Sequence, residues 1–290
     1  ILKVDIIPRF SMNTSFADIE KKENRKDLII SICVFLSGFS CFAQLYYFQP
    51  LLPDLAKDFI LSASESSFAI SFSTLGMVFG LFTTMFVADR IPRKKMIGTG
   101  LLSSSIFSVA ASFSPTFLPL ILLSAAKGFL LSGATSVSMA YIAEEVSSRN
   151  KGKIMGLYIA GNALGGMAGR VISSWIGALY TWRIASVSIG LICALFAILF
   201  LLFSPRSTNF MPRKESFHTL IIANLQLITS KALIPFYLTG GLILGVFVSL
   251  YNYLGFYLTK APFNFPEHYL FNVGIFSKCP YKIQWHMKMP

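Results

Sequence analysis

Long runs of apolar residues, separated by short polar segments, fill most of this 290-residue chain. Seven runs each have the length that a helix rising 1.5 Å per residue needs to cross about 30 Å of hydrocarbon. A soluble protein has no interior large enough to bury so many apolar helices, so the pattern predicts an all-α polytopic protein with the lipid bilayer as its solvent. The predicted spans are residues 28–50, 66–88, 96–113, 117–142, 154–178, 183–203 and 233–257.

The loops between these runs carry Lys and Arg unequally. The segments on the same side of the predicted membrane as the N-terminus hold seventeen Lys and Arg. The loops on the opposite side, up to the sixth run, hold only Lys57 and Arg183. Cytoplasmic loops are enriched in Lys and Arg, so we predict a cytoplasmic N-terminus. The net charge of +12 therefore follows from topology. A nucleic-acid partner is not expected, because the cations do not gather with aromatic residues on one solvated face.

The runs divide the chain into five parts. Residues 1–27 form a charged leader, 28–203 a six-helix lobe and 204–232 a basic connector that is longer than the other loops. A seventh helix at 233–257 follows, and 258–290 form an aberrant tail without an apolar span or a hairpin signal. Within the connector, a helical stripe predicts a short helix at the membrane surface, made by Phe217, Leu220, Ile221, Leu225 and Ile228.

The loop after the second run carries the most specific motif, Asp89-Arg90-Ile91-Pro92-Arg93-Lys94-Lys95. It resembles the signature between the second and third helices of the major facilitator superfamily, which reads Gly, three residues, Asp-Arg, one residue, Gly, Arg-Lys. Met85 and Pro92 stand at the two glycine positions. The resemblance implies a conformational switch in which the Asp contacts a second lobe and the second Arg pairs with an acid ending the fourth helix. The alternative is that the cations only fix topology. The residues concerned are Asp89, Arg90, Arg93, Lys94, Glu144 and Glu145.

The fifth run carries a second motif. Gly161, Gly165 and Gly169 recur every four residues, so they share one helix face and permit close approach of a neighbouring helix. The string from Gly161 through Asn162 to Gly165-Gly166 resembles the fifth-helix motif of the same superfamily, Gly-Pro, two residues, Gly-Gly, which is associated with export by antiport. Asn162 stands where that motif has Pro. Arg170 follows, and it is equally a structural anchor or a gate.

The resemblance runs from about residue 28 to 265 and is closest to bacterial twelve-helix exporters of the drug and arabinose-efflux type. It implies the major facilitator fold, with the six-helix N-terminal lobe and the first helix of the C-terminal lobe present here. It further implies proton-coupled efflux of a small organic molecule across the bacterial inner membrane by alternating access. Because alternating access needs a second lobe, we expect the 290 residues alone not to catalyse transport. The alternative function is therefore a truncated, non-transporting remnant of such a transporter.

Lys127 lies ten residues into the fourth run and so near the bilayer midplane, where an ionisable residue is costly and is a functional candidate. It can pair with a substrate anion or modulate a proton site, or it can reach water without a specific duty. Helices one, four and seven line the cavity in the family. The cavity candidates are Gln44, Tyr47, Gln49, Lys127, Tyr251 and Asn252.

Acidic residues avoid the middle of every predicted span. Proton coupling is therefore implied by the resemblance and not by a carboxylate within the bilayer. His218, His268 and His286 form no cluster at metal-ligand spacing, and no Gly-rich phosphate loop is present, so neither an enzyme nor a cofactor or metal is expected.

Overall fold

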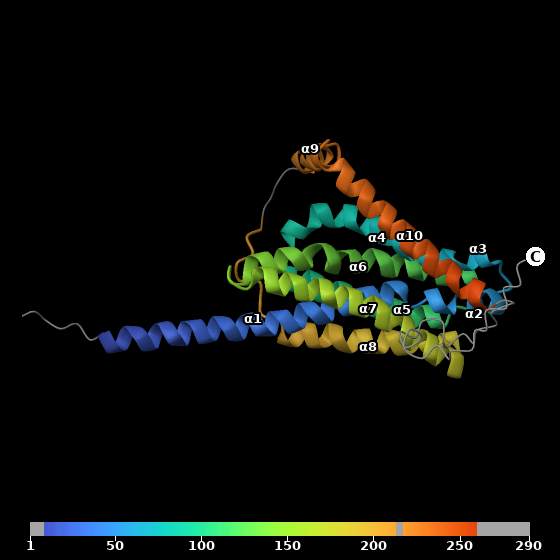
Figure 1. Ribbon diagram of the computed structural model, residues 1–290, viewed down its shortest axis with the longest axis horizontal. Helices are drawn as coiled ribbons and strands as arrows, with labels where there is room; N and C mark the ends of the chain where they lie inside the picture. Colours follow the sequence, from blue (N-terminus) through green and yellow to red (C-terminus); the bar gives the residue numbers. More distant parts are fainter. Residues whose placement is uncertain (1–8, 213–216, 260–290) are drawn as a thin grey trace, which may run out of the picture.

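The computed structural model describes residues 9–212 and 217–259, and their regular structure is helical. The long helices are α1 (Arg9–Tyr46), α4 (Phe68–Val87), α5 (Arg93–Ser112), α6 (Phe117–Glu145), α7 (Lys151–Leu179), α8 (Trp182–Phe203) and α10 (Ile234–Thr259). The short elements are η1 (Gln49–Leu51), α2 (Leu52–Asp58), α3 (Ala63–Ser66), η2 (Ala88–Arg90) and α9 (Phe217–Ile228). Figure 1 shows the long helices α1 and α4 to α8 side by side in one bundle.

Each predicted apolar run coincides with one of the long helices. By length and composition, four helical stretches among the described residues can cross a membrane: Glu23–Asp58, Ala63–Arg90, Phe117–Glu145 and Trp182–Phe203. Helices α5 and α7 are as long but less apolar, because α5 is rich in Ser and α7 in Gly. The first predicted span, 28–50, lies within the apolar stretch Glu23–Asp58 but runs past the end of α1 at Tyr46. Pro50 lacks the backbone N–H that would continue the helix, and the chain turns through η1 into α2.

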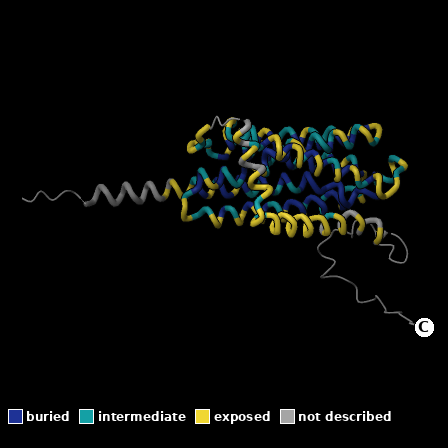
Figure 2. Tube along the Cα trace, turned by 90° about the horizontal axis from the view of Figure 1, so that it is seen from above, coloured by how far each residue is buried: buried dark blue, intermediate teal, exposed yellow. Residues whose placement is uncertain are grey.

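Helix α1 is central to the bundle, since it contacts α4, α5, α6, α7 and α8. The buried apolar residues form two clusters, one around Leu131 and Tyr141 and the other around Tyr47 and Leu120. Figure 2 shows the buried residues gathered in the interior of the bundle. Between the two clusters, α5 and α6 bury polar residues instead: Ser104, Ser105, Ser108, Ser124 and Lys127.

The antiparallel helices give the bundle two distinct ends. The basic end holds the start of the buried part of α1, the turn at 88–92, the loop at 146–150 and the connector from residue 204. At the opposite end, Asp58 accepts a hydrogen bond from Trp182 Nε1 at 2.9 Å and pairs with Arg183 at 3.2 Å. These contacts tie α2 to the start of α8.

Helix α10 lies outside the bundle. It contacts η1 and α2, and most of its described side chains are exposed, with 74% of Phe236 and 69% of Val246 accessible. The predicted connector helix is present as α9, Phe217–Ile228. The predicted tail, 258–290, lies almost wholly outside the described residues, as do residues 1–8 of the leader.

Glycines bring α7 against α1. A Cβ atom built on Gly161 would lie 2.6 Å from the Phe35 carbonyl oxygen, and one on Gly169 would lie 2.7 Å from Ala43 Cα. On Gly165 it would overlap the backbone of Phe39. The two helices therefore approach backbone to backbone, which only glycine allows.

We expect Gly161→Ala to destabilise the protein by about 1–3 kcal/mol, because the methyl group must push α1 away from α7. Thermal unfolding of the purified protein in detergent measures this. Gly156→Ala is the matched control on the same helix, since a Cβ at Gly156 meets nothing within 4 Å. Equal unfolding temperatures for the two variants would contradict the close approach.

Candidate functional site

The motif after α4 forms an ion-pair network at the basic end. Arg93 opens α5, where a cation is unfavourable because the helix N-terminus carries partial positive charge. Two carboxylates offset that charge: Arg93 Nη2 lies 2.9 Å from both Asp89 Oδ1 and Glu144 Oε1. Arg93 Nε also donates to Glu144, and Nη1 donates to the Ala88 carbonyl at 2.6 Å.

This network joins three elements through one guanidinium. Asp89 comes from η2, Arg93 from α5 and Glu144 from α6. The guanidinium side chain is only 9% exposed, whereas that of Asp89 is 38% exposed. Asp89 therefore has the most accessible side chain of the three residues, and a further element can contact it. Arg90 is exposed on the same turn.

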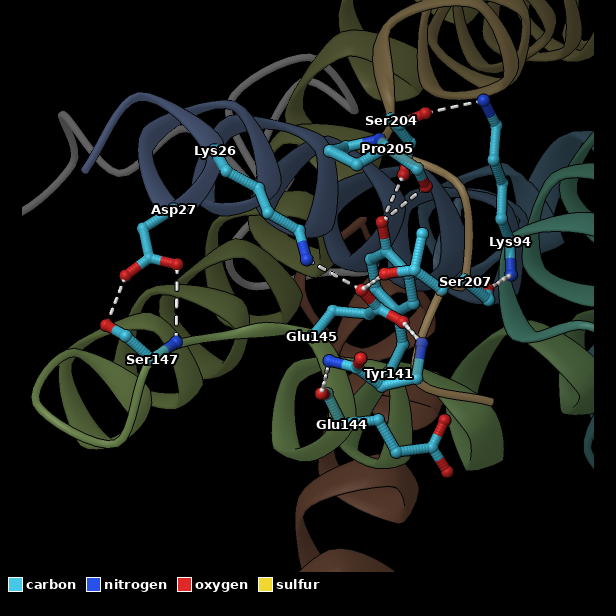
Figure 3. A network of polar contacts seen from close by, with 12 residues as sticks. Lys26, Asp27, Lys94, Tyr141, Glu144, Glu145, Ser147, Ser204, Pro205 and Ser207 are labelled. Carbon is cyan, nitrogen blue, oxygen red and sulfur yellow. Dashed lines mark hydrogen bonds and ion pairs between the residues drawn. The ribbon is translucent and has the colours of Figure 1, made fainter. Parts of the chain in front are cut away.

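The two candidate acids of α6 have different partners. Side chains of consecutive helical residues point about 100° apart, so Glu144 and Glu145 cannot face the same partner. Glu145 has a fully buried side chain and pairs with Lys26 of α1 at 2.7 Å. It also accepts hydrogen bonds from Thr208 Oγ1 and from the Asn209 backbone N–H, both in the connector. Figure 3 shows Glu145 between α1 and the connector.

Lys127 lies within the bundle and is 1% exposed. Its Nζ lies 4.5 Å from the ring centroid of Tyr47 and 4.9 Å from that of Phe48. Among the described residues, Nζ has no hydrogen-bond partner. The two aromatic faces stabilise a cation only partly, so this position retains an unmet capacity to donate hydrogen bonds.

A chain of polar contacts extends from this lysine towards Gln44. Tyr47 Oη lies 2.8 Å from Ser186 Oγ. The Ser186 hydroxyl donates to the Ser108 carbonyl at 2.9 Å. Ser108 Oγ in turn donates to Gln44 Oε1 at 3.1 Å. Gln44 Nε2 is buried, and the described residues provide no partner for it. The structure thus brings Gln44, Tyr47 and Lys127 together in one buried polar layer.

Arg170 occupies a separate site nearer the opposite end. Its Nε donates to Gln49 Oε1, its Nη1 donates to the Gly166 carbonyl at 2.9 Å, and its guanidinium carbon lies 4.5 Å from the ring centroid of Tyr46. Arg170 therefore ties α7 to the end of α1. Asn162 lies on α7 against Gly38 of α1. Tyr251 and Asn252 belong to α10, and their side chains lie outside the described part of the structure.

Sequence reasoning missed several residues of the basic end. Asp27 accepts hydrogen bonds from Ser147 Oγ and from Asn150 Nδ2 at 2.8 Å, which fixes the loop between α6 and α7. Lys26 and Asp27 are charged residues at the start of the first apolar run, and that position could have marked them as candidates for contacts at the end of the bundle. The connector residues Thr208 and Asn209, which bind Glu145, have no comparable feature in the sequence. The described residues contain no group of three or more His, Cys, Asp or Glu that could hold a metal ion.

Comparison with known proteins identifies the fold. The sequence profile of the Major Facilitator Superfamily matches residues 31–277. An uncharacterized transporter of Buchnera aphidicola subsp. Schizaphis graminum is 35% identical over 89% of this chain and 62% of its own length. The inner membrane transport protein YnfM of Escherichia coli is 35% identical over 81% of this chain and 56% of its own length. The uncharacterized MFS-type transporter YybF of Bacillus subtilis is 31% identical over 86% of this chain and 63% of its own length.

A solved structure has the same arrangement of helices. A bacterial homologue of the human lysosomal transporter Spinster, in an inward-facing and unoccupied conformation, superposes with a TM-score of 0.70 at 14% identity. The match covers 85% of this chain and 58% of that one. The chain thus spans between 56% and 63% of the length of the three relatives above. Since the family profile matches most of its residues, including the whole bundle from α4 to α8, the chain belongs to the Major Facilitator Superfamily of membrane transporters.

Proposed function

We propose that this chain works as the N-terminal lobe of a secondary active transporter that exports a small organic molecule of drug or sugar type across the bacterial inner membrane. The substrate crosses the membrane by alternating access, and a proton gradient drives its export. The observation that carries the proposal is the Asp89–Arg93–Glu144 network at one end of the six-helix bundle. Such a network can exchange partners when a lobe rocks.

The basic end faces the cytoplasm in this proposal. The segments rich in Lys and Arg meet at this end of the bundle, which supports the orientation that the uneven distribution of cations predicts. The exposed carboxylate of Asp89 is then available to a second lobe at the cytoplasmic surface.

Lys127 is the proposed contact for the substrate or for a group that carries the coupling proton. A buried ammonium without a hydrogen-bonding partner in the described bundle can accept a ligand anion at little competing cost. Gln44 and Tyr47 lie in the same polar layer and extend that surface, whereas Gln49 is engaged by Arg170. Tyr251 and Asn252 of α10 are proposed to complete the cavity.

The transporter relatives favour this function over the alternative of a non-transporting remnant. The chain spans less than two thirds of those relatives, so the activity proposed here is that of the whole transporter. Proteoliposomes that hold the whole transporter, with an imposed proton gradient, test it, with ethidium and radiolabelled arabinose as probes. Gradient-driven flux of either probe above protein-free vesicles supports the proposal. Flux of neither probe, with correctly folded protein, counts against export of drug or sugar type.

Asp89→Asn keeps the size of the side chain but removes its charge, so the ion pair with Arg93 is lost. We expect transport of the active probe to fall by on the order of tenfold or more, while membrane insertion and unfolding temperature stay near those of the parent, because Arg93 keeps Glu144 and the Ala88 carbonyl as partners and water reaches residue 89. Glu23→Gln, an exposed carboxylate of α1, is the control. Undiminished transport by Asp89→Asn would refute the role of this loop in switching.

Lys127→Ala removes the buried ammonium. If that group binds the transported molecule, the KM for an anionic substrate rises by on the order of tenfold, the effect of one lost charge-assisted hydrogen bond. Ser124→Ala, one turn away on the same buried face, controls for loss of packing. The same KM values as the parent across a panel of anionic and neutral substrates would show that Lys127 has no part in recognition.

A further inference from the structure

The first residues of the connector are bound across the basic end of the bundle. This segment, residues 204–210, is here called the strap. Tyr141 Oη of α6 lies 2.8 Å from Ser204 Oγ and donates to the Pro205 carbonyl at 2.8 Å. The backbone N–H of Lys94 donates to Ser207 Oγ at 3.0 Å, and Lys94 Nζ donates to the Ser204 carbonyl. Figure 3 shows these contacts.

The second half of the strap contacts the two acids of α6. Thr208 Oγ1 and the Asn209 N–H bind the Glu145 carboxylate at 2.8 and 2.7 Å. Asn209 Nδ2 donates to the Glu144 carbonyl at 2.8 Å, and the guanidinium carbon of Arg93 lies 4.9 Å from the ring centroid of Phe210. The next residue, Met211, is 81% exposed, so the bound segment ends there.

Through these contacts, the strap shares residues with the switch network. Lys94 and Arg93 belong to the same motif as Asp89. Glu144, which pairs with Arg93, also accepts a hydrogen bond from Asn209 on its backbone carbonyl. Movement of Arg93 away from Asp89 and Glu144 therefore removes the cation from the Phe210 ring. Lifting the strap in turn removes two donors from the buried carboxylate of Glu145, which then needs water in their place.

We propose that the strap is a moving part of the switch: it is docked while the Asp89–Arg93–Glu144 ion pairs are formed and is released when they break. The proposal rests on the switching role assigned to Asp89 above. Because the docked state satisfies Glu145 and the released state exposes it to water, intermediate positions leave a buried charge short of partners and are disfavoured. The strap leads through the connector to α9 and α10, so its release changes the tether between the bundle and α10.

Hydrogen–deuterium exchange of the intact protein in nanodiscs tests this without any substrate. The reporter is the peptide that covers residues 205–212, in which the Asn209 N–H is bound to Glu145. Tyr141→Phe deletes the hydroxyl that holds Ser204 and Pro205 but keeps the ring, which packs 6.4 Å from that of Phe200. Asp89→Asn breaks the remote ion pair. Tyr158→Phe is the control, since its hydroxyl makes a 3.4 Å contact with the Thr135 carbonyl away from the strap.

We expect both Tyr141→Phe and Asp89→Asn to raise exchange in the strap by about fivefold, the population change that one lost hydrogen bond produces, while Tyr158→Phe does not. Unchanged strap exchange in Tyr141→Phe would show that this hydroxyl does not hold the strap, and unchanged exchange in Asp89→Asn would show that the strap is a fixed cover. Either result overturns the proposal. If Asp89→Asn abolishes transport while strap exchange stays at the parent level, the proposed transport function survives and only the strap proposal fails.

Discussion

Where α1 crosses α7, three glycines bring the two backbones into direct contact, and much of the bundle depends on that approach. Helix α1 also contacts α4, α5, α6 and α8, so its position sets the depth of every side chain that it carries. The middle of α1 carries Lys26 and Asp27 to the basic end, and its C-terminal end carries Gln44, with Tyr47 directly after it, to the buried layer around Lys127. A larger residue on the shared face would move all of these groups together, because they lie on α1 or directly after its last residue.

The interior of the bundle contains many buried serines, yet burying most of them costs little free energy. Ser104, Ser132 and Ser138 each donate to a backbone carbonyl three or four residues earlier, so their hydroxyls are satisfied within their own helices. Lys127 Nζ and Gln44 Nε2 differ, since the described residues leave both without such an acceptor. The hydroxyls of Ser40, Ser73, Ser114 and Ser124 also have no partner among the described residues, but a buried ammonium is far more costly to leave without one, which is why the proposal gives ligand or proton handling to the layer around Lys127.

Hydrophobic runs predicted the long helices because a bilayer fixes their length, and the family motif predicted which loop would hold paired charges. The end of the first helix was placed too late although Pro50 marks it, because the apolar run continues through the proline and hydrophobicity alone gives no boundary there. The sequence could not separate Glu144 from Glu145, because their roles depend on the direction of two adjacent side chains on α6. The strap was missed for a different reason: its contacts are mostly ordinary backbone and hydroxyl groups, which have no distinctive spacing in a sequence.

The charges at the basic end differ in how easily they can change partners, and this difference sets an order for the proposed transition. The Asp89 side chain is 38% exposed, so water can solvate this carboxylate when Arg93 leaves. The Glu145 side chain is fully buried, although that of Lys26 is 33% exposed, so loss of this pair leaves a buried carboxylate short of a partner unless water or a new partner enters. In the transition proposed above, we therefore expect the Asp89 contact to break first and the contact between Glu145 and Lys26 to break last. In that order of events, helix α1 stays attached to α6 while η2 and the strap move, and the glycine contact between α1 and α7 is kept.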